Sequence, residues 1–248
     1  MGPVFGWSGV SITANFAGTS LKARLNDEEG YNYFYVIIDE GEPVTVGLSS
    51  GEAQYDLASG LADGVHKVEI VKKTEGYDGT TTFLGFELDE GKGLAAAPLR
   101  PALKLEFYGD SHGAGYSCEC TCDSGSAEYK NNYMAYPGIT SRILGAEYSS
   151  ITWSGIGIAT AKPIITDVWD RTLPEDSDSV WDFNEFVPDA VVINLGANDL
   201  YWWGTEEDLV PAWEDFVTNY LRPVYPDAHI VLVNSYGWAF DEPADYVY

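Results

Sequence analysis

The amino-terminal third of the chain alternates apolar and polar residues in short runs, the period expected of strands that bury one face. Turn signals such as Asp63-Gly64 and Asp78-Gly79 separate the runs, and no helical period occurs between them. This pattern predicts a β-sandwich, of the jelly-roll kind. The expected strands are Val10 to Ala17, Ser20 to Leu25, Asn32 to Ile38, His66 to Lys73 and Thr81 to Leu88.

Beyond residue 101 the pattern changes to apolar strands alternating with helical segments, as in an α/β domain with a parallel sheet. Leu103 to Tyr108 and Ile230 to Val233 predict buried strands. A helix before the second strand has one apolar face, and Pro211 is acceptable only in its first turn. That face consists of Leu209, Trp213, Phe216, Val217, Tyr220 and Leu221.

A Gly- and Pro-rich connector, Glu90 to Pro101, separates the two patterns. With 248 residues the chain exceeds the usual size of one domain. We therefore predict a β-sandwich domain over residues 1–100 and an α/β domain over residues 101–248.

Three motifs follow predicted strands of the α/β domain. Gly109-Asp110-Ser111 places Ser111 at a strand-to-helix corner, where unpaired backbone amides suit an oxyanion. In Ser154-Gly155 the glycine leaves a backbone N–H accessible, and in Gly196-Ala197-Asn198-Asp199 the side-chain amide of Asn198 is a neutral donor. Active sites of such sheets lie at the carboxyl ends of the strands, so the three motifs are expected to meet there.

In this order the motifs resemble the signature blocks of the SGNH (GDSL-like) hydrolases, an esterase superfamily with a flavodoxin-like α/β fold. The preceding segment resembles the amino-terminal β-domain of the family 2 carbohydrate esterases, so the resemblance covers nearly the whole chain. Its stretches are Phe5-Gly6-Trp7-Ser8-Gly9, Phe16-Ala17-Gly18-Thr19, Gly60-Leu61-Ala62-Asp63-Gly64-Val65-His66 and Lys72-Lys73-Thr74-Glu75.

The resemblance implies a secreted or surface deacetylase acting on O-acetylated plant polysaccharide such as xylan or glucomannan, with no metal or other cofactor. Ser111 matches the nucleophile, and Gly155, Asn198 and the backbone amide of Ser111 match the oxyanion hole. The family's general base is a histidine in a late Asp-x-x-His block, which this sequence does not contain.

The sequence stops at Tyr248, soon after the strand Ile230 to Val233, where an α/β domain of this kind should add a further strand and helices. We therefore expect the C-terminal part of the hydrolase domain to be missing, and the catalytic histidine with it. An incomplete sheet exposes an edge that favours association. A homodimer and a second polypeptide that supplies the missing piece are both open alternatives.

None of the three histidines matches the family's base. His66 begins a strand of the sandwich and is expected to be structural. His229 begins a strand whose catalytic end lies about 15 Å away, at roughly 3.3 Å for each residue. His112 directly follows the nucleophile and is expected to line the pocket, with a role as surrogate base as the alternative.

Aromatic residues near the motifs suggest a binding surface for sugar. Trp202 and Trp203 follow the Asn198-Asp199 turn, and we expect them, with His112 and Tyr116, to contact substrate. Other tryptophans, namely Trp153, Trp169, Trp181 and Trp213, are expected in the core. Asp110 and Asp199 are expected to shape their turns by accepting backbone N–H bonds, although a glycosidase-like acid and base pair is the alternative reading.

The net charge of −26, from 39 acidic and 13 basic residues, argues against nucleic acid or an anionic membrane as partner. It suits either a secreted protein from a saline or acid source or a surface that maintains solubility. No run of 18 apolar residues could span a membrane. The amino terminus shows no signal peptide, so secretion would require one that has been removed.

All three cysteines lie in Cys118-Glu119-Cys120-Thr121-Cys122, which is not a zinc spacing. A disulfide between Cys118 and Cys122 with one free thiol, or three free thiols, are the open alternatives. For function, the alternatives to an active esterase are an inactive truncated esterase and a carbohydrate-binding protein without catalysis.

Overall fold

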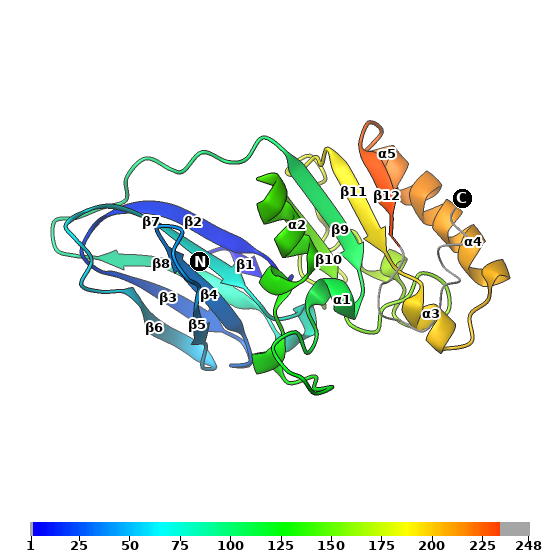
Figure 1. Ribbon diagram of the computed structural model, residues 1–248, viewed down its shortest axis with the longest axis horizontal. Coiled ribbons are helices and arrows are strands. Elements are labelled where there is room, and N and C mark those ends of the chain that lie inside the picture. The colour runs from blue at the N-terminus through cyan, green and yellow to red at the C-terminus, as the bar shows by residue number, and fades with distance from the viewer. Residues whose placement is uncertain (1, 234–248) are drawn as a thin grey trace.

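Two antiparallel sheets form the amino-terminal half of the computed structural model, which describes residues 2–233 (Figure 1). Their strand orders are β1-β8-β3-β6 and β2-β7-β4-β5. The strands are β1 (Val4–Phe5), β2 (Ser11–Gly18), β3 (Leu21–Asp27), β4 (Tyr33–Ile38), β5 (Val44–Gly47), β6 (Gly51–Ala58), β7 (Gly64–Lys72) and β8 (Thr81–Leu88). Side chains from both sheets, including Phe16, Leu25, Phe34 and Ile70, share one buried core, which confirms the β-sandwich.

All five strands predicted from the alternation are present, with bounds that differ by at most two residues. The unpredicted strands β1, β5 and β6 are all at sheet edges. An edge strand is shielded on one side only, and β5 exposes almost every residue. Its side chains therefore carry little of the hydrophobic alternation on which the prediction depended.

The carboxyl-terminal half is built on one parallel sheet with the strand order β10-β9-β11-β12. Its strands are β9 (Lys104–Gly109), β10 (Glu147–Thr152), β11 (Ala190–Asn194) and β12 (His229–Leu232). The α-helices are α1 (Ser111–Ala114), α2 (Tyr136–Leu144), α3 (Ala197–Tyr201), α4 (Glu206–Asp215) and α5 (Arg222–Val224). Helix α2 lies on the side of the sheet nearer the sandwich, and α4 and α5 lie on the other side (Figure 1). The predicted α/β sheet is thus confirmed.

Short helical turns complete this half. The 3₁₀ turns are η1 (Gly76–Asp78), η2 (Ala127–Tyr129), η3 (Asn132–Met134) and η4 (Ile165–Asp167). A π-helical segment, η5 (Phe216–Leu221), joins α4 to α5.

The predicted amphipathic helix corresponds to α4 and η5, and Leu209, Trp213, Phe216 and Leu221 are buried in the core of the sheet. The restriction of Pro211 to the first turn was wrong. A capping box between Thr205 and Asp208 starts the helix at Glu206, so Pro211 lies inside it, at the sixth position.

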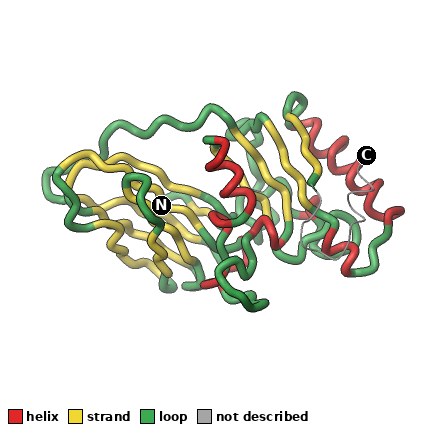
Figure 2. The backbone as a smooth tube through the Cα atoms, in the orientation of Figure 1, coloured by secondary structure: helices red, strands yellow, loops and turns green. Residues whose placement is uncertain are grey.

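The connector from Glu90 to Pro101 crosses between the two halves as a loop without a helix or a strand of its own (Figure 2). The domain boundary near residue 100 stays a prediction. The two halves also touch directly, because Trp7 of the sandwich half is buried in the core of the parallel sheet. Its indole Nε1 donates a hydrogen bond to the carbonyl of Arg171 at 2.9 Å, and its ring packs edge-on against Trp153.

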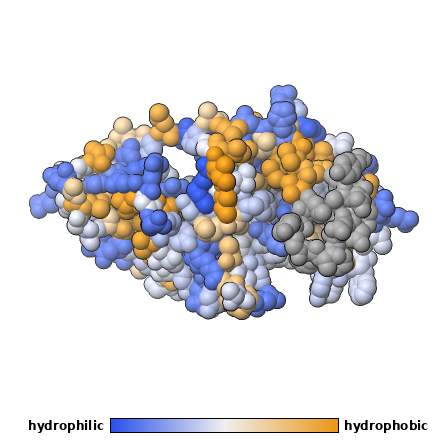
Figure 3. Space-filling view, viewed as in Figure 1, coloured by the Kyte–Doolittle hydropathy of each residue, from blue (hydrophilic) through white to orange (hydrophobic). Residues whose placement is uncertain are grey.

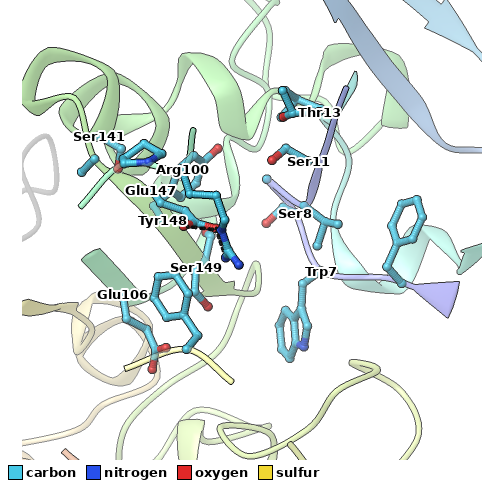
Figure 4. Close-up of a pocket in the computed structure, with 18 of the residues that line it drawn as sticks. Trp7, Ser8, Ser11, Thr13, Arg100, Glu106, Ser141, Glu147, Tyr148 and Ser149 are labelled. Atoms are coloured by element: carbon cyan, nitrogen blue, oxygen red, sulfur yellow. Dashed lines mark hydrogen bonds and ion pairs between the residues drawn. The ribbon is translucent and has the colours of Figure 1, made fainter. Parts of the chain in front are cut away.

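A cavity of about 850 Å³ lies between the halves, lined by residues from both, and the molecular surface is hollowed there (Figure 3). Arg100 of the connector and Glu147 of β10 form an ion pair at its wall, and Trp7 lies across from them (Figure 4). Glu106, also on the wall, is buried, which raises its pKa to about 7. None of the three predicted catalytic residues lines this cavity.

Candidate active site

Three adjacent strands of the parallel sheet end at the same level. In the register, Gly109 at the end of β9 pairs with Thr152 at the end of β10 and with Asn194 at the end of β11. Ser111, Gly155 and Asn198 follow these three positions by two, three and four residues. The fold therefore brings all three predicted residues to one edge of the sheet, where α1 and α3 begin (Figure 1).

Ser111 is the first residue of α1, in a turn held by its own neighbours. The Asp110 carboxylate caps the helix by accepting the backbone N–H of His112 at 3.0 Å, and Gly115 ends it with a φ of 79°. The backbone amides of Gly115 and Tyr116 both donate to the carbonyl of Ser111 at 3.0 Å. Ser111 itself is half-buried, so its hydroxyl remains within reach of a substrate.

The carboxylate of Asp110 is fully buried, and its Oδ2 has no hydrogen-bond partner among residues 2–233. Burial raises the pKa of Asp110, and the nearby Asp199 adds to this shift, while His112 opposes it. Asp110 thus shapes the nucleophile turn, as predicted, through a single bond from a backbone amide.

Asn198 lies in the first turn of α3, directly after the turn that Gly196 makes with a φ of 109°. Its Nδ2 donates a hydrogen bond to the carbonyl of Ile156 at 2.9 Å. Since a side-chain amide carries two N–H donors, this bond orients the group and leaves its second hydrogen for another acceptor.

Gly155 lies in the loop of residues 154–161, has a φ of 84° and is exposed, and no atom beyond its two chain neighbours lies within 4 Å of where a Cβ would stand. Two carboxylates from other parts of the chain hold this loop. Glu75 accepts the backbone N–H of Ser154 at 2.8 Å and its hydroxyl at 2.7 Å. Asp199 accepts the backbone amides of residues 158 to 161, at 2.6 to 3.0 Å.

Asp199 accepts backbone N–H bonds as predicted, but these come from the distant residues 158 to 161, so the prediction that its carboxylate shapes its own turn is wrong. Glu75 was not predicted as a site residue. The sequence around it, Lys72-Lys73-Thr74-Glu75, is a run of charged residues after an apolar strand, and such a run usually indicates a solvent-exposed surface. In the structure Lys72, Lys73 and Glu75 are all fully buried.

The histidines occupy different places. His66 lies in the sandwich, where its ring nitrogens contact Asp39 Oδ2 at 2.6 Å and the carbonyl of Ala62 at 2.8 Å, so its structural role is confirmed. His229 begins β12 opposite Ala190, at the end of the sheet away from Ser111. The Nδ1 of His112 lies 3.6 Å from Asp110 Oδ1, and its side chain is partly exposed beside Ser111.

The predicted substrate-contacting aromatics differ in exposure. Trp202 and Trp203, at the end of α3, are 61% and 89% exposed. Tyr116 is half-buried, and its hydroxyl lies against Gly125. Their contacts with a substrate stay a prediction.

Of the tryptophans expected in the core, Trp213 is buried, and Trp153 and Trp169 pack against the same cluster. Trp181 is half-buried and lines the cavity between the halves.

Neither alternative considered for the cysteines, a Cys118–Cys122 disulfide or three free thiols, is found. Cys120 and Cys122 are bonded instead, because the chain turns at Thr121 and brings their Cα atoms to 5.1 Å. Cys118 carries the free thiol and is exposed. Within residues 2–233 no cluster of His, Cys, Asp or Glu is arranged to hold a metal ion. The same residues contain no helix long and apolar enough to cross a membrane.

Comparison with known families divides the chain as the fold does. Residues 1–98 match the family described as carbohydrate esterase 2 N-terminal, and residues 107–248 match the GDSL-like lipase/acylhydrolase family.

Two curated relatives are similar over most of the chain. Cellulase/esterase CelE of Acetivibrio thermocellus is 38% identical over 92% of this chain and 29% of its own length. An acetylxylan esterase/glucomannan deacetylase of Cellvibrio japonicus is 30% identical over 93% of this chain and 68% of its own. The chain thus spans less than a third of the first of these relatives and about two thirds of the second.

Among solved structures, a family two carbohydrate esterase from Clostridium thermocellum in complex with cellohexaose superposes with a TM-score of 0.93. It is 36% identical, and the match covers 99% of this chain and 78% of that one.

Proposed function

Because this chain belongs to the GDSL-like lipase/acylhydrolase family and carries the amino-terminal domain of the family 2 carbohydrate esterases, we propose that it removes O-acetyl groups from plant polysaccharide with Ser111 as nucleophile. One observation carries the proposal. Ser111, Gly155 and Asn198 follow three adjacent strands whose ends are in register, so a nucleophile and two neutral N–H donors share one edge.

The proposed reaction is acyl transfer. The Ser111 hydroxyl attacks the acetyl carbonyl, and the backbone amides of Ser111 and Gly155 with the second Asn198 amide hydrogen bind the oxyanion. The sugar hydroxyl leaves with a proton, and water then attacks the acyl-serine to release acetate and regenerate Ser111.

The base that takes the Ser111 proton is, in this proposal, a histidine that the 248 residues do not contain. His66 and His229 lie away from Ser111, and His112, whose Nδ1 lies 3.6 Å from Asp110 Oδ1, is the alternative base among these residues. A further segment of the protein or a second polypeptide would supply the missing histidine.

The proposed substrate is an acetylated polysaccharide or oligosaccharide outside the cell. Trp202 and Trp203 present exposed indole rings near Asn198, suited to stacking on sugar rings. The net charge of −26 disfavours anionic polymers but not neutral sugars. The Cys120–Cys122 disulfide supports an oxidising, extracellular setting.

Acetate release from acetylated xylan and from p-nitrophenyl acetate tests the nucleophile. In a form of the protein that includes the base, we expect Ser111→Ala to lower the rate by about 10³-fold or more, as the loss of a catalytic serine does elsewhere, whereas the 248 residues alone should turn over very slowly. Ser126→Ala, an exposed serine in the loop after α1, is the matched control and should keep the wild-type rate. A Ser111→Ala variant as active as wild type would overturn the assignment.

A carbohydrate-binding protein without catalysis is the second candidate, favoured by the exposed Trp202 and Trp203. Titration calorimetry with deacetylated xylan or glucomannan separates the two. A binding protein should bind the deacetylated polymer and lose affinity in Trp203→Ala while releasing no acetate.

A further inference from the structure

The Ser154–Gly155 peptide is anchored by a residue of the other half of the molecule. Glu75 follows β7 of the sandwich, 79 residues before Ser154. Its Oε2 accepts the Ser154 backbone N–H at 2.8 Å and its Oε1 accepts the Ser154 hydroxyl at 2.7 Å. The two bonds fix both the backbone and the side chain of the residue directly before Gly155.

The Glu75 carboxylate is itself held firmly. It is fully buried, and its Oε1 also accepts the Tyr77 hydroxyl at 2.9 Å. The ammonium of Lys130, also fully buried, lies 3.6 Å from Oε1 and donates to both oxygens of Asp78 at 2.8 Å. A buried ion with this many partners has little freedom to move.

We propose that Glu75 is a positioning residue for the esterase reaction, which aims the Gly155 amide at the oxyanion by fixing the Ser154–Gly155 peptide. This inference rests on the proposed function, since it takes Gly155 as an oxyanion donor. Gly155 has no side chain of its own to hold it. A bond from the Ile156 N–H to the Trp153 carbonyl at 3.2 Å closes the turn around it, and the two Glu75 bonds fix that turn at Ser154. The sandwich thus contributes directly to the geometry of the reaction.

An oxyanion donor acts in the transition state rather than on bound substrate, so its misplacement lowers kcat and leaves KM unchanged. In Glu75→Gln an amide nitrogen replaces one of the two accepting oxygens. The Ser154 backbone N–H and hydroxyl then no longer each have a carboxylate oxygen to donate to. We expect kcat to fall about 10- to 100-fold, in the range that a misplacement of about 1 Å causes. Ser154→Ala removes only the hydroxyl bond and should lower kcat by less, about 3- to 10-fold.

Glu119→Gln is the matched control. Glu119 also joins the two halves through a carboxylate, accepting from Lys73 at 2.8 Å, but its partners are Lys73, Tyr35 and Asn131 rather than the loop of residues 154–161. Its kcat should remain within about twofold of wild type. Hydrogen exchange of residues 153–157 in the 248-residue chain adds a readout that needs no turnover. Exchange there should rise in Glu75→Gln and stay unchanged in Glu119→Gln.

The kinetic measurements use a form of the protein that shows acetate release dependent on Ser111. If Ser111→Ala retains full activity, the proposed function fails, whereas exchange still tests the anchor. If Ser111→Ala is inactive but Glu75→Gln keeps wild-type kcat and exchange, the positioning role is wrong and the function stands. Should Glu75→Gln not fold, Ser154→Ala decides, and an unchanged kcat with unchanged exchange would overturn the proposal.

Discussion

The nucleophile turn and the loop of residues 154–161 meet at one edge of the sheet. They differ in how far along the chain the carboxylates that hold them lie. Around Ser111, the capping carboxylate, the helix and the closing glycine all lie within residues 110 to 115. The loop has carboxylates at both ends that come from far along the chain, Glu75 79 residues before and Asp199 about 40 residues after.

This difference shows how one site combines local and non-local folding information. The capping bonds of the turn are local, and Asn131 and Asn132 add two bonds from further along the chain, to the carbonyls of Gly115 and Gly113 at 2.9 and 2.7 Å. The loop has local backbone bonds, such as that from the Ile156 N–H to the Trp153 carbonyl, but its carboxylate anchors come from the sandwich and from α3. The part of the oxyanion hole at Gly155 should therefore be the more fragile of the two.

The largest loss in the free energy of unfolding is expected for Asp199→Asn. Four backbone amides of the loop donate to this carboxylate, and the substituted amide group would face some of them with a donor. Since bonds to a charged acceptor stabilise by about 1.5 to 3 kcal/mol each, we expect a loss of about 3 to 5 kcal/mol. Urea unfolding measures it, and a loss below about 1 kcal/mol would show that the loop does not depend on Asp199.

Two glycines with nearly the same backbone conformation sharpen the contrast. Gly115, with a φ of 79°, would place a Cβ 2.3 Å from the backbone of Asn131. Gly115→Ala combines left-handed strain with a clash against main chain, so we expect a loss of about 3 kcal/mol in the free energy of unfolding. Equal losses at Gly115 and Gly155 would contradict this steric account.

Gly155→Ala should cost only about 1 kcal/mol, since a φ of 84° brings strain while nothing lies within 4 Å of the added carbon. Thermal unfolding alongside Gly115→Ala gives the comparison. Acetate release by the same variant tests whether the open space at Gly155 is used, because a methyl group there would crowd a bound acetyl group.

The smallest change in the free energy of unfolding is expected for Asp110→Asn, and its size depends on pH. Because burial raises the pKa of Asp110, the carboxyl favours folding while protonated and loses that contribution as pH rises through its raised value. The variant should therefore be as stable as wild type or slightly more so at pH 7, by less than about 1 kcal/mol. That advantage should shrink toward pH 4, near the ordinary value of Asp, and an advantage that grows on acidification would contradict the shift.

The same contrast explains what the sequence could predict. The turn at Ser111 and the helix at Asn198 follow from strand patterns, glycines and capping residues that are close in sequence. Strands β1 and β5 escaped prediction because they are only two and four residues long, whereas β6 alternates half-buried and exposed residues and was missed despite that pattern. Glu75 escaped because its burial involves Lys130 and Ser154, which lie far along the chain, as well as the nearby Tyr77.

The disulfide shows the same limit on a shorter scale. Spacing alone left the pairing among Cys118, Cys120 and Cys122 open, and the bond between the two later cysteines depends on how the chain turns at Thr121. Likewise, Pro211 lies inside α4 because the capping box of Thr205 starts the helix at Glu206. The hydrophobic period of a helix does not determine where the helix starts.

The indole of Trp7 restricts how this architecture can change by recombination. It belongs by sequence to the sandwich and by packing to the neighbouring sheet, where it meets Trp153 and the carbonyl of Arg171. Grafting the hydrolase half onto a foreign sandwich would leave a void the size of an indole and a carbonyl without its donor. Exchange between genes should thus preserve the two halves as a pair, unlike accessory modules that are traded freely through flexible tethers.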